Sequence, residues 1–257
     1  MHADHNNMDP EPFEVFNAQA TSPVLLICEH ASCHMPAEYD HLGLPVEHRE
    51  SHIAWDPGAL GAARQMAEDM GAVLIAGTLS RLLYDLNRPP TAAGAMPARS
   101  EVIDVPGNVD LPERERKRRI AHIYKPFHGR VAEALARRVA PVIVTVHSFT
   151  PVYLGKTREV EIGLLHDADS RLTDAMLEIA KDHSTHRVER NAPYGPQDGV
   201  MHTLNIHGDA NGHPGVMIEV RNDLIKTGEQ QAEIGRMLAG WVGDALAWMD
   251  ANMAGVL

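Results

Sequence analysis

Four short runs of apolar residues, each bounded by turn-forming residues, recur along the chain. They are residues 24–28, 72–76, 142–146 and 216–220. Short, mainly apolar runs of this length are typical of strands that are buried on both faces of a largely parallel sheet. A fifth segment, residues 158–165, alternates polar and apolar positions before it becomes apolar, which predicts a more exposed or antiparallel strand.

The segments between these runs have helical patterns, and the predicted fold class is therefore α/β. Residues 58–70 follow Asp56 and Pro57, which have the composition of a helix N-cap and first turn, and Gly71 stands where such a helix would end. Further helices are expected at residues 112–139, 170–181, 200–205 and 229–252. The last of these is long enough to close the fold.

Neither a repeat nor a flexible linker divides the chain, so we expect one α/β domain over residues 21–257. Residues 1–20 are predicted to form a flexible N-terminal tail. The longest stretch without clear periodicity, residues 89–112, contains several prolines and glycines, and loops of that length are usually functional or mobile. A lid over a site is one interpretation of this stretch.

The charge balance limits the class of partner. The 257 residues carry a formal net charge of −12, which argues against nucleic acid, because nucleic-acid binding depends on clustered Lys and Arg. We interpret the basic run at residues 114–119 as a solvated helix face, with a nucleic-acid patch as the minor alternative. An anionic substrate would need a local cluster of arginines elsewhere.

Cysteine usage and hydropathy address the compartment. Cys28 and Cys33 are the only cysteines; two are too few for a disulfide-stapled scaffold, and they fit a reducing compartment. The amino terminus lacks the basic start and apolar run of a signal peptide, and no apolar stretch approaches the roughly 20 residues of a membrane span. We therefore expect a cytoplasmic protein without a membrane partner, present as a monomer or a small homo-oligomer.

Polar residues that a core would not select stand at the ends of three of the apolar runs. They are Glu29 and His30, His147 and Ser148, and Glu219 with Arg221 and Asn222. In open α/β sheets, ligands bind outside the carboxyl ends of the strands, so these residues can converge although they are distant in sequence. Period-two alternation places Glu219 and Arg221 on one face of their strand.

Each of these residues also has a structural interpretation. A buried Glu219 is costly unless it is paired or has a function, and an ion pair with an arginine is as good an account as catalysis. For His30 or His147 alone, a histidine that caps a loop is the simpler interpretation, and Asp56 alone is typical of a helix N-cap. Cys33 can join a zinc site, although a small buried thiol is the simpler account.

Residues 80–90 (SRLLYDLNRPP) place Arg81, Asp85, Asn87 and Arg88 within a few positions. Two guanidinium groups near a strand end suit bidentate binding of carboxylates, and Asp85 can orient one of them. A salt-bridged turn is the structural alternative. The combination is more specific than any one of its members.

Five motifs together carry a family resemblance. They are CEHAS (residues 28–32), HIAWDPGA (52–59), SRLLYDLNRPP (80–90), TVHSF (145–149) and GVMIEVRNDL (215–224). In this order they resemble the N-formylglutamate amidohydrolase family, over about 200 residues. The first motif reads Glu-His-Ala-Ser where the best-known members have Pro-His-Ser-Gly, so the chain resembles a divergent branch.

The resemblance implies a three-layer α/β/α sandwich around a mostly parallel mixed sheet, as in zinc carboxypeptidases. It implies that His30, Asp56 and His147 hold zinc or another divalent metal and that Glu219 is the general base and acid. It further implies a set of residues that bind the substrate carboxylates and polarise the carbonyl: Arg81, Asn87, Arg88, Arg221 and Asn222. His52, Ser148 and His128 are candidates for orienting the ligands.

The activity implied is hydrolysis of a small anionic N-acyl amino acid, first of all N-formyl-L-glutamate to formate and glutamate, as in histidine degradation. Two histidines and one carboxylate leave an open position on a zinc ion, as catalytic sites require. The alternatives are a deacylase or carboxypeptidase for another acyl amino acid or short peptide, and a metal-free binding protein on the same scaffold.

Overall fold

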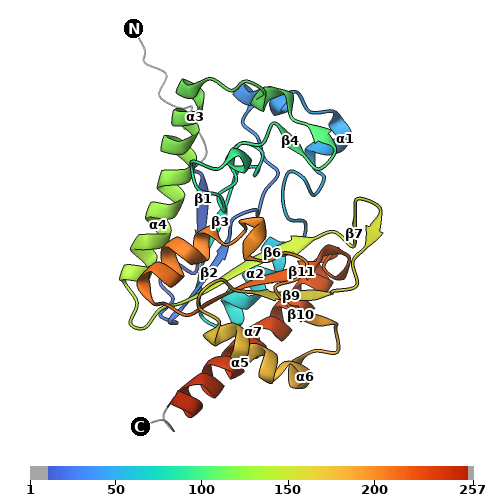
Figure 1. Cartoon of the computed structure of the whole chain (residues 1–257). Coiled ribbons are helices and arrows are strands. Elements are labelled where there is room, and N and C mark those ends of the chain that lie inside the picture. Colours follow the sequence, from blue (N-terminus) through green and yellow to red (C-terminus); the bar gives the residue numbers. More distant parts are fainter. Residues whose placement is uncertain (1–10, 254–257) are drawn as a thin grey trace.

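The computed structural model describes residues 11–253, and its centre is a seven-stranded sheet with the order β1-β3-β2-β6-β11-β9-β10 (Figure 1). The strands are β1 (Phe13–Phe16), β2 (Val24–Cys28), β3 (Val73–Gly77), β6 (Val142–Phe149), β9 (Ile162–Leu165), β10 (Val188–Arg190) and β11 (Gly215–Arg221). β2 pairs in parallel with β3 and β6, β6 with β11, and β9 with β10, whereas β1–β3 and β9–β11 are antiparallel. The predicted mostly parallel mixed sheet is confirmed.

Helices cover both faces of this sheet. The elements outside it are α1 (Val46–Arg49), α2 (Ala59–Asp69), α3 (Glu113–Arg119), α4 (Lys125–Ala136), α5 (Arg171–Glu178), α6 (Ala180–His183), α7 (Gly228–Met253) and the small hairpins β4 (Arg99–Ser100) with β5 (Ile103–Asp104) and β7 (Val152–Tyr153) with β8 (Lys156–Thr157). α2, α5 and α7 pack on one face, while α4 and the loops at residues 35–54 and 79–105 pack on the other. The three-layer α/β/α prediction is confirmed.

The alternation of side chains along β2 explains why its residues are all apolar. Val24, Leu26 and Cys28 point into the core formed with α2, α5 and α7, whereas Leu25 and Ile27 point into the core on the other face. All five side chains are buried. An uninterrupted apolar run is therefore what a strand with two covered faces requires.

Several boundaries differ from the sequence-based expectations. Residues 1–10 lie outside the described part, but Phe13–Phe16 forms the edge strand β1, paired antiparallel with β3, so the prediction of a tail through residue 20 is wrong there. Its apolar residues Phe13 and Val15 pack against the core, and this burial of apolar surface stabilises an ordered strand. The expected helix at residues 112–139 is observed as α3 and α4 joined by a π-helical turn, Ile120–Tyr124.

The longest helix, α7, packs against α2 and α5 and is not a membrane span. Across residues 11–253, no helix has both the length and the apolar character that crossing a bilayer would demand.

Candidate active site

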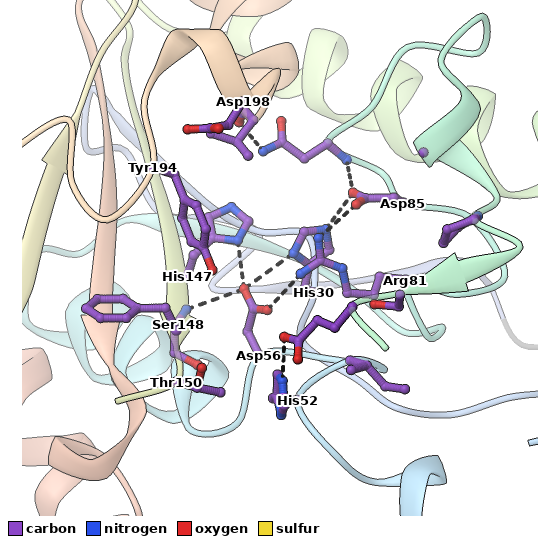
Figure 2. A pocket seen from close by; sticks show the side chains of 18 of the residues that line it. His30, His52, Asp56, Arg81, Asp85, His147, Ser148, Thr150, Tyr194 and Asp198 are labelled. Carbon is purple, nitrogen blue, oxygen red and sulfur yellow. Dashed lines mark hydrogen bonds and ion pairs between the residues drawn. The ribbon is translucent and has the colours of Figure 1, made fainter. Parts of the chain in front are cut away.

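The site lies at the carboxyl ends of three neighbouring strands. His30 follows β2, His147 lies in β6 and Glu219 lies in β11, where it stands directly opposite His147 in the parallel register. Asp56 comes from the loop before α2, and the loop after β3 supplies Arg81 and Asp85 (Figure 2). The sheet order thus brings together residues that are up to about 190 positions apart in sequence, as expected for a parallel sheet.

The three predicted metal ligands form one buried cluster. Nδ1 of His147 lies 2.8 Å and Nδ1 of His30 lies 3.3 Å from Oδ2 of Asp56. One ligand atom from each residue lies within 4.8 Å of the others, and each residue is 3% exposed. Two imidazole nitrogens and one carboxylate oxygen are a donor set that suits zinc.

Asp56 does not serve as the cap of α2, the structural alternative for this residue. The residue before α2 is Gly58, with φ of 85°, and no side chain caps the helix. The Asp56 carboxylate instead accepts hydrogen bonds from the backbone N–H of Ser148 at 3.3 Å and from Arg81 at 3.3 Å, besides its contacts with the histidines. Its carboxylate is therefore oriented towards the cluster.

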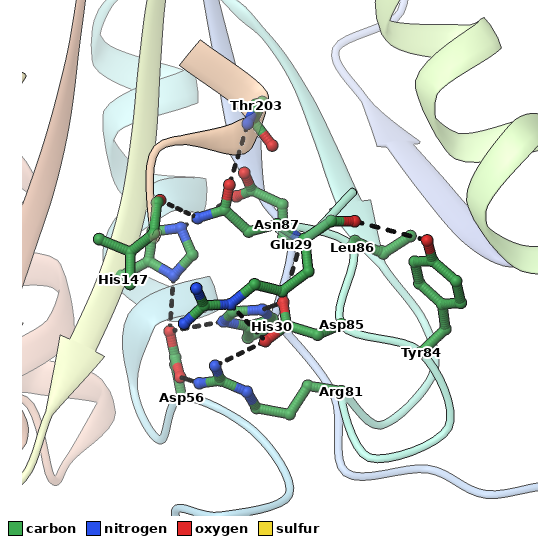
Figure 3. Close-up of polar contacts among 12 residues, drawn as sticks. Glu29, His30, Asp56, Arg81, Tyr84, Asp85, Leu86, Asn87, His147 and Thr203 are labelled. Atoms are coloured by element: carbon green, nitrogen blue, oxygen red, sulfur yellow. Dashed lines mark hydrogen bonds and ion pairs between the residues drawn. The ribbon is translucent and has the colours of Figure 1, made fainter. Parts of the chain in front are cut away.

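Two further carboxylates, those of Asp85 and Glu29, orient the two histidines (Figure 3). Nε2 of His30 donates to Oδ1 of Asp85 at 2.7 Å, and Nε2 of His147 lies 3.1 Å from Oε2 of Glu29. In both imidazole rings, therefore, Nδ1 faces Asp56 and Nε2 faces another carboxylate. Metal-binding histidines usually have such a partner on the far nitrogen, because it fixes the ring and its tautomer.

The charges of this cluster favour a divalent cation. Burial alone would raise the pKa of Glu29, but its ion pair with His147 outweighs this and holds the pKa at about 2. The pKa values of Asp56 and Asp85 are likewise held below their usual range, against burial, by His30 and Arg81. The same carboxylates raise the pKa values of His30 and His147 against burial, and a dication at the cluster would replace the positive charge of the protonated rings.

Glu219 has the environment of a proton acceptor. It is 5% exposed, and its Oε2 atom has no hydrogen-bond partner among the described residues. Burial, together with the negative charge of Asp56, raises the pKa of this carboxyl to about 7. A carboxyl that gains or loses a proton near neutral pH suits general base and acid catalysis.

The predicted substrate-binding residues occupy three kinds of position. Arg81 bonds Asp85 at 2.9 Å in the cavity wall, and Arg88 also lines the cavity while donating to the carbonyl of Asp198 at 2.6 Å. Asn87 lines the cavity too, but its side-chain amide donates to the carbonyl of Val200 and accepts from the N–H of Thr203 at 2.9 Å. Its side chain therefore stabilises the loop at residues 200–203, of which Val200 lines the cavity.

Arg221 and Asn222 do not line the cavity. The Arg221 guanidinium donates to Asp223 at 2.7 Å and to Glu161 at 3.3 Å, so it forms a surface ion-pair network at the end of β11. Alternation along β11 predicted that Arg221 shares a face with Glu219. The strand ends at Arg221, however, and its long side chain turns away from that face. The structure thus separates these two residues from the other predicted site residues.

The three candidates for orienting the ligands differ as well. Ser148 bonds Asp56 through its backbone N–H, and its hydroxyl donates to the carbonyl of Pro57 at 2.9 Å. His52 pairs with Glu101 at 2.8 Å at the rim. His128 and Cys33 do not line the cavity.

A cavity of about 400 Å³ opens above the cluster, a volume that suits a small molecule. Its wall includes residues to which the sequence motifs gave no role: Tyr153, Tyr194, Arg99, Ser100 and Glu101. The last three belong to the stretch 89–112, which is anchored by Asn108, whose amide donates to the carbonyls of Leu82 at 2.8 Å and Pro97 at 3.0 Å. The segment therefore forms part of the wall.

We expect loss of either outer carboxylate to weaken metal binding without removing a ligand. Glu29→Gln and Asp85→Asn each remove the negative charge that fixes a histidine ring, and such changes lower metal affinity about 10- to 100-fold. Competition with a chelator of known affinity measures this change. The matched control is Glu113→Gln, an exposed carboxylate that pairs with Lys117. If all three variants bind zinc equally, the orienting role is contradicted.

The buried pair His128 and His207 predicts a loss of stability in mild acid. Nε2 of His128 donates to the carbonyl of Leu86 at 2.8 Å, and its Nδ1 lies 3.0 Å from Nε2 of His207. Burial and the neighbouring histidines lower the pKa of His128 to about 3 and that of His207 to about 4. Below about pH 6.5 the unfolded chain therefore binds more protons than the folded protein, and stability falls as the pH drops towards 4.

His207→Gln keeps a donor for His128 but does not titrate. Between pH 6.5 and 4.5 the slope of the unfolding free energy against pH should decrease by up to about 1.4 kcal/mol per pH unit, the value for one proton. Urea denaturation at several pH values measures this slope. His122→Gln, at an exposed position, should leave it unchanged, and equal slopes for His207→Gln and the wild type would contradict the prediction.

Known proteins share this fold. A crystal structure of a gene product from Agrobacterium tumefaciens is 51% identical, with a TM-score of 0.91 over 93% of this chain and 96% of that chain. An N-formylglutamate amidohydrolase from Ralstonia eutropha is 20% identical, with a TM-score of 0.62 over 94% of this chain and 99% of that chain. A comparison with curated proteins found no match. A family model for N-formylglutamate amidohydrolases matches residues 22–226, so this chain belongs to the N-formylglutamate amidohydrolase family.

Proposed function

We propose that this chain is a zinc-dependent amidohydrolase that cleaves the amide bond of a small anionic N-acyl amino acid, first of all N-formyl-L-glutamate to formate and glutamate. The observation that carries the proposal is the buried cluster of His30, Asp56 and His147, with Glu219 opposite His147 in the next strand and its Oε2 atom without a hydrogen-bond partner in residues 11–253. Two further features support it: the family to which the chain belongs, and its structural similarity to the N-formylglutamate amidohydrolase from Ralstonia eutropha.

His30, Asp56 and His147 would hold the metal through Nδ1, a carboxylate oxygen and Nδ1. When bound, zinc supplies Lewis acidity, which makes water a better nucleophile near neutral pH and polarises an acyl carbonyl. Oε2 of Glu219 is the atom placed to accept a proton from the attacking water, because it is buried and has no other partner among the described residues. Glu219 then returns that proton to the departing amine nitrogen.

The cavity wall supports an anionic substrate. The Arg88 side chain is 25% exposed, lies 3.9 Å from Asp85 and keeps part of its donor set free for a substrate carboxylate. Arg81 is bonded to two carboxylates, so its charge is largely compensated, and its role is to fix Asp56 and Asp85 and to stabilise negative charge at the acyl group. Guanidinium groups suit carboxylates because they donate in a bidentate geometry.

Both cysteines are free thiols, which supports action in the reducing environment of the cytoplasm. We infer a monomer or a small homo-oligomer, with no nucleic-acid or membrane partner. The second candidate function is a deacylase for a different acyl group. It is favoured by the Glu-His-Ala-Ser sequence at the first motif, where better-known members of the family have Pro-His-Ser-Gly.

The test is a hydrolysis assay on zinc-loaded protein with formyl, acetyl and succinyl derivatives of glutamate, aspartate and glutamine, coupled to metal analysis. We expect one stoichiometric zinc ion and the highest kcat/KM for N-formyl-L-glutamate. A higher value for another acyl group supports the second candidate. Protein that binds no divalent metal and hydrolyses none of these compounds would refute both.

A further inference from the structure

An arginine at the edge of the cavity is stabilised by aromatic rings. The guanidinium carbon of Arg158 lies 4.5 Å from the ring centroid of Tyr153, 4.8 Å from that of Tyr194 and 5.5 Å from that of Phe149. Nη1 of Arg158 donates to the carbonyl of Thr150 at 3.4 Å, and no carboxylate of the described residues lies within 4.0 Å of this guanidinium. The positive charge of Arg158 is therefore stabilised by ring faces and one carbonyl, and it remains available to polarise a neighbour.

That neighbour is the hydroxyl of Tyr194. Nη2 of Arg158 donates to the Tyr194 oxygen at 2.9 Å. A guanidinium can only donate, so the tyrosine oxygen is the acceptor and its own O–H proton must point to another partner. Within residues 11–253, no group accepts that proton.

The Tyr194 side chain lines the reaction space, and its O–H has no acceptor among the described residues. Tyr194 lines the same cavity as Glu219, Arg81 and His147, and Figure 2 shows its ring beside His147. Burial and the nearby Glu219 raise the pKa of Tyr194 to about 12, so the hydroxyl keeps its proton at neutral pH. Its oxygen is fixed from one side by Arg158, so a molecule in the cavity can accept the O–H of Tyr194.

We propose that Tyr194 is a further catalytic residue, which donates a hydrogen bond to the substrate oxygen that becomes negative during attack, and that Arg158 is its positioning residue. The inference rests on the proposed hydrolase function and adds to it a donor that no family motif contains. A hydroxyl whose oxygen is already held in place by Arg158 needs little reorganisation when charge develops, which is the requirement for electrostatic stabilisation. No proton is transferred in this step; the hydrogen bond only strengthens.

The kinetic test compares four variants with the zinc-loaded wild type on its best acyl amino acid. Tyr194→Phe should lower kcat about 100-fold or more with KM changed less than about threefold, the effect of losing one donor to a developing oxyanion. Arg158→Met should lower kcat by a smaller factor, and Arg158→Lys, which retains the charge and a donor, should restore part of it. Tyr39→Phe, which removes a hydroxyl at the remote contact with Arg118 and Arg119, should leave both constants unchanged.

The possible outcomes distinguish failure of the Tyr194 role from failure of the proposed hydrolase function. An inert wild type refutes the proposed function. An active wild type whose kcat survives in Tyr194→Phe, or whose loss appears only in KM, overturns the inference alone.

A measurement without turnover tests the positioning step. In protein labelled with ¹³C at tyrosine Cζ, the Tyr194 resonance is the one that disappears in Tyr194→Phe. Arg158→Met should shift that resonance more than those of the other tyrosines, since it loses the donor at 2.9 Å. A Tyr194 resonance that does not move would show that Arg158 does not hold the hydroxyl.

Discussion

Glu219→Gln is expected to bind zinc at the wild-type stoichiometry and to lose hydrolysis of N-formyl-L-glutamate by about 10³-fold or more. Glutamine has nearly the same shape as glutamate and can fill the same place opposite His147 in β11. It cannot accept a proton, and removal of a general base typically costs a factor of about 10² to 10⁴. Metal analysis and a kcat determination on the same preparation measure both parts of the prediction.

Two comparisons make this result specific to proton transfer. Glu38→Gln, an exposed carboxylate paired with Arg118, should retain both zinc and activity. The buried charge at position 219 is also costly, so Glu219→Gln should unfold at the same or a slightly higher urea concentration than the wild type. If Glu219→Gln retains activity within about tenfold of the wild type, another group must be the base, and the role assigned to Glu219 is wrong.

The apolar runs predicted the centre of this fold well because each strand is covered on both faces. The run at residues 24–28 matches β2 at both ends, and the predicted helix at residues 58–70 differs from α2 by one residue at each end. The edge strand β1 was not predicted. It is only four residues long, includes the polar Glu14 and lies in a segment whose composition resembles a tail. Its pairing with β3 is a long-range contact that no local pattern contains.

The site could be predicted as far as chain topology determines it. His30 and His147 end parallel strands, so the sheet alone brings them to one edge, and Asp56 precedes the helix between β2 and β3. The side-chain partners could not be predicted, because they depend on the paths of loops. Asp85 was expected to orient an arginine, and it does, but it also bonds His30.

Arg221 and Tyr194 show the same limit from opposite sides. Arg221 stands two residues after Glu219, yet its guanidinium pairs with Asp223 and Glu161 beyond the strand end. Tyr194 lies in a loop without regular structure, far in sequence from every motif, and reaches the cavity only because its loop passes over the carboxyl end of the sheet. Side-chain direction at the ends of strands is decided by tertiary contacts, which a single sequence does not encode locally.

His147→Asn should have the largest effect on metal binding. It removes one of the three ligand atoms of the cluster, so zinc affinity should fall by more than the roughly 100-fold limit for losing an orienting carboxylate, and hydrolysis should become undetectable. His122→Asn, at an exposed position, is the matched control and should retain zinc and activity. Full zinc occupancy in His147→Asn would contradict the assignment of the cluster as the metal site.

The same substitution should also destabilise the fold, for a reason that can be separated from metal loss. Glu29 is 1% exposed and lies 3.1 Å from Nε2 of His147, so His147→Asn leaves a buried carboxylate without its partner, at a cost of about 3–5 kcal/mol. The double variant Glu29→Gln with His147→Asn removes that charge and should recover most of the unfolding free energy, measured by urea denaturation, while zinc binding stays lost. Recovery of zinc binding together with stability would instead show that His147 acts only as the partner of Glu29.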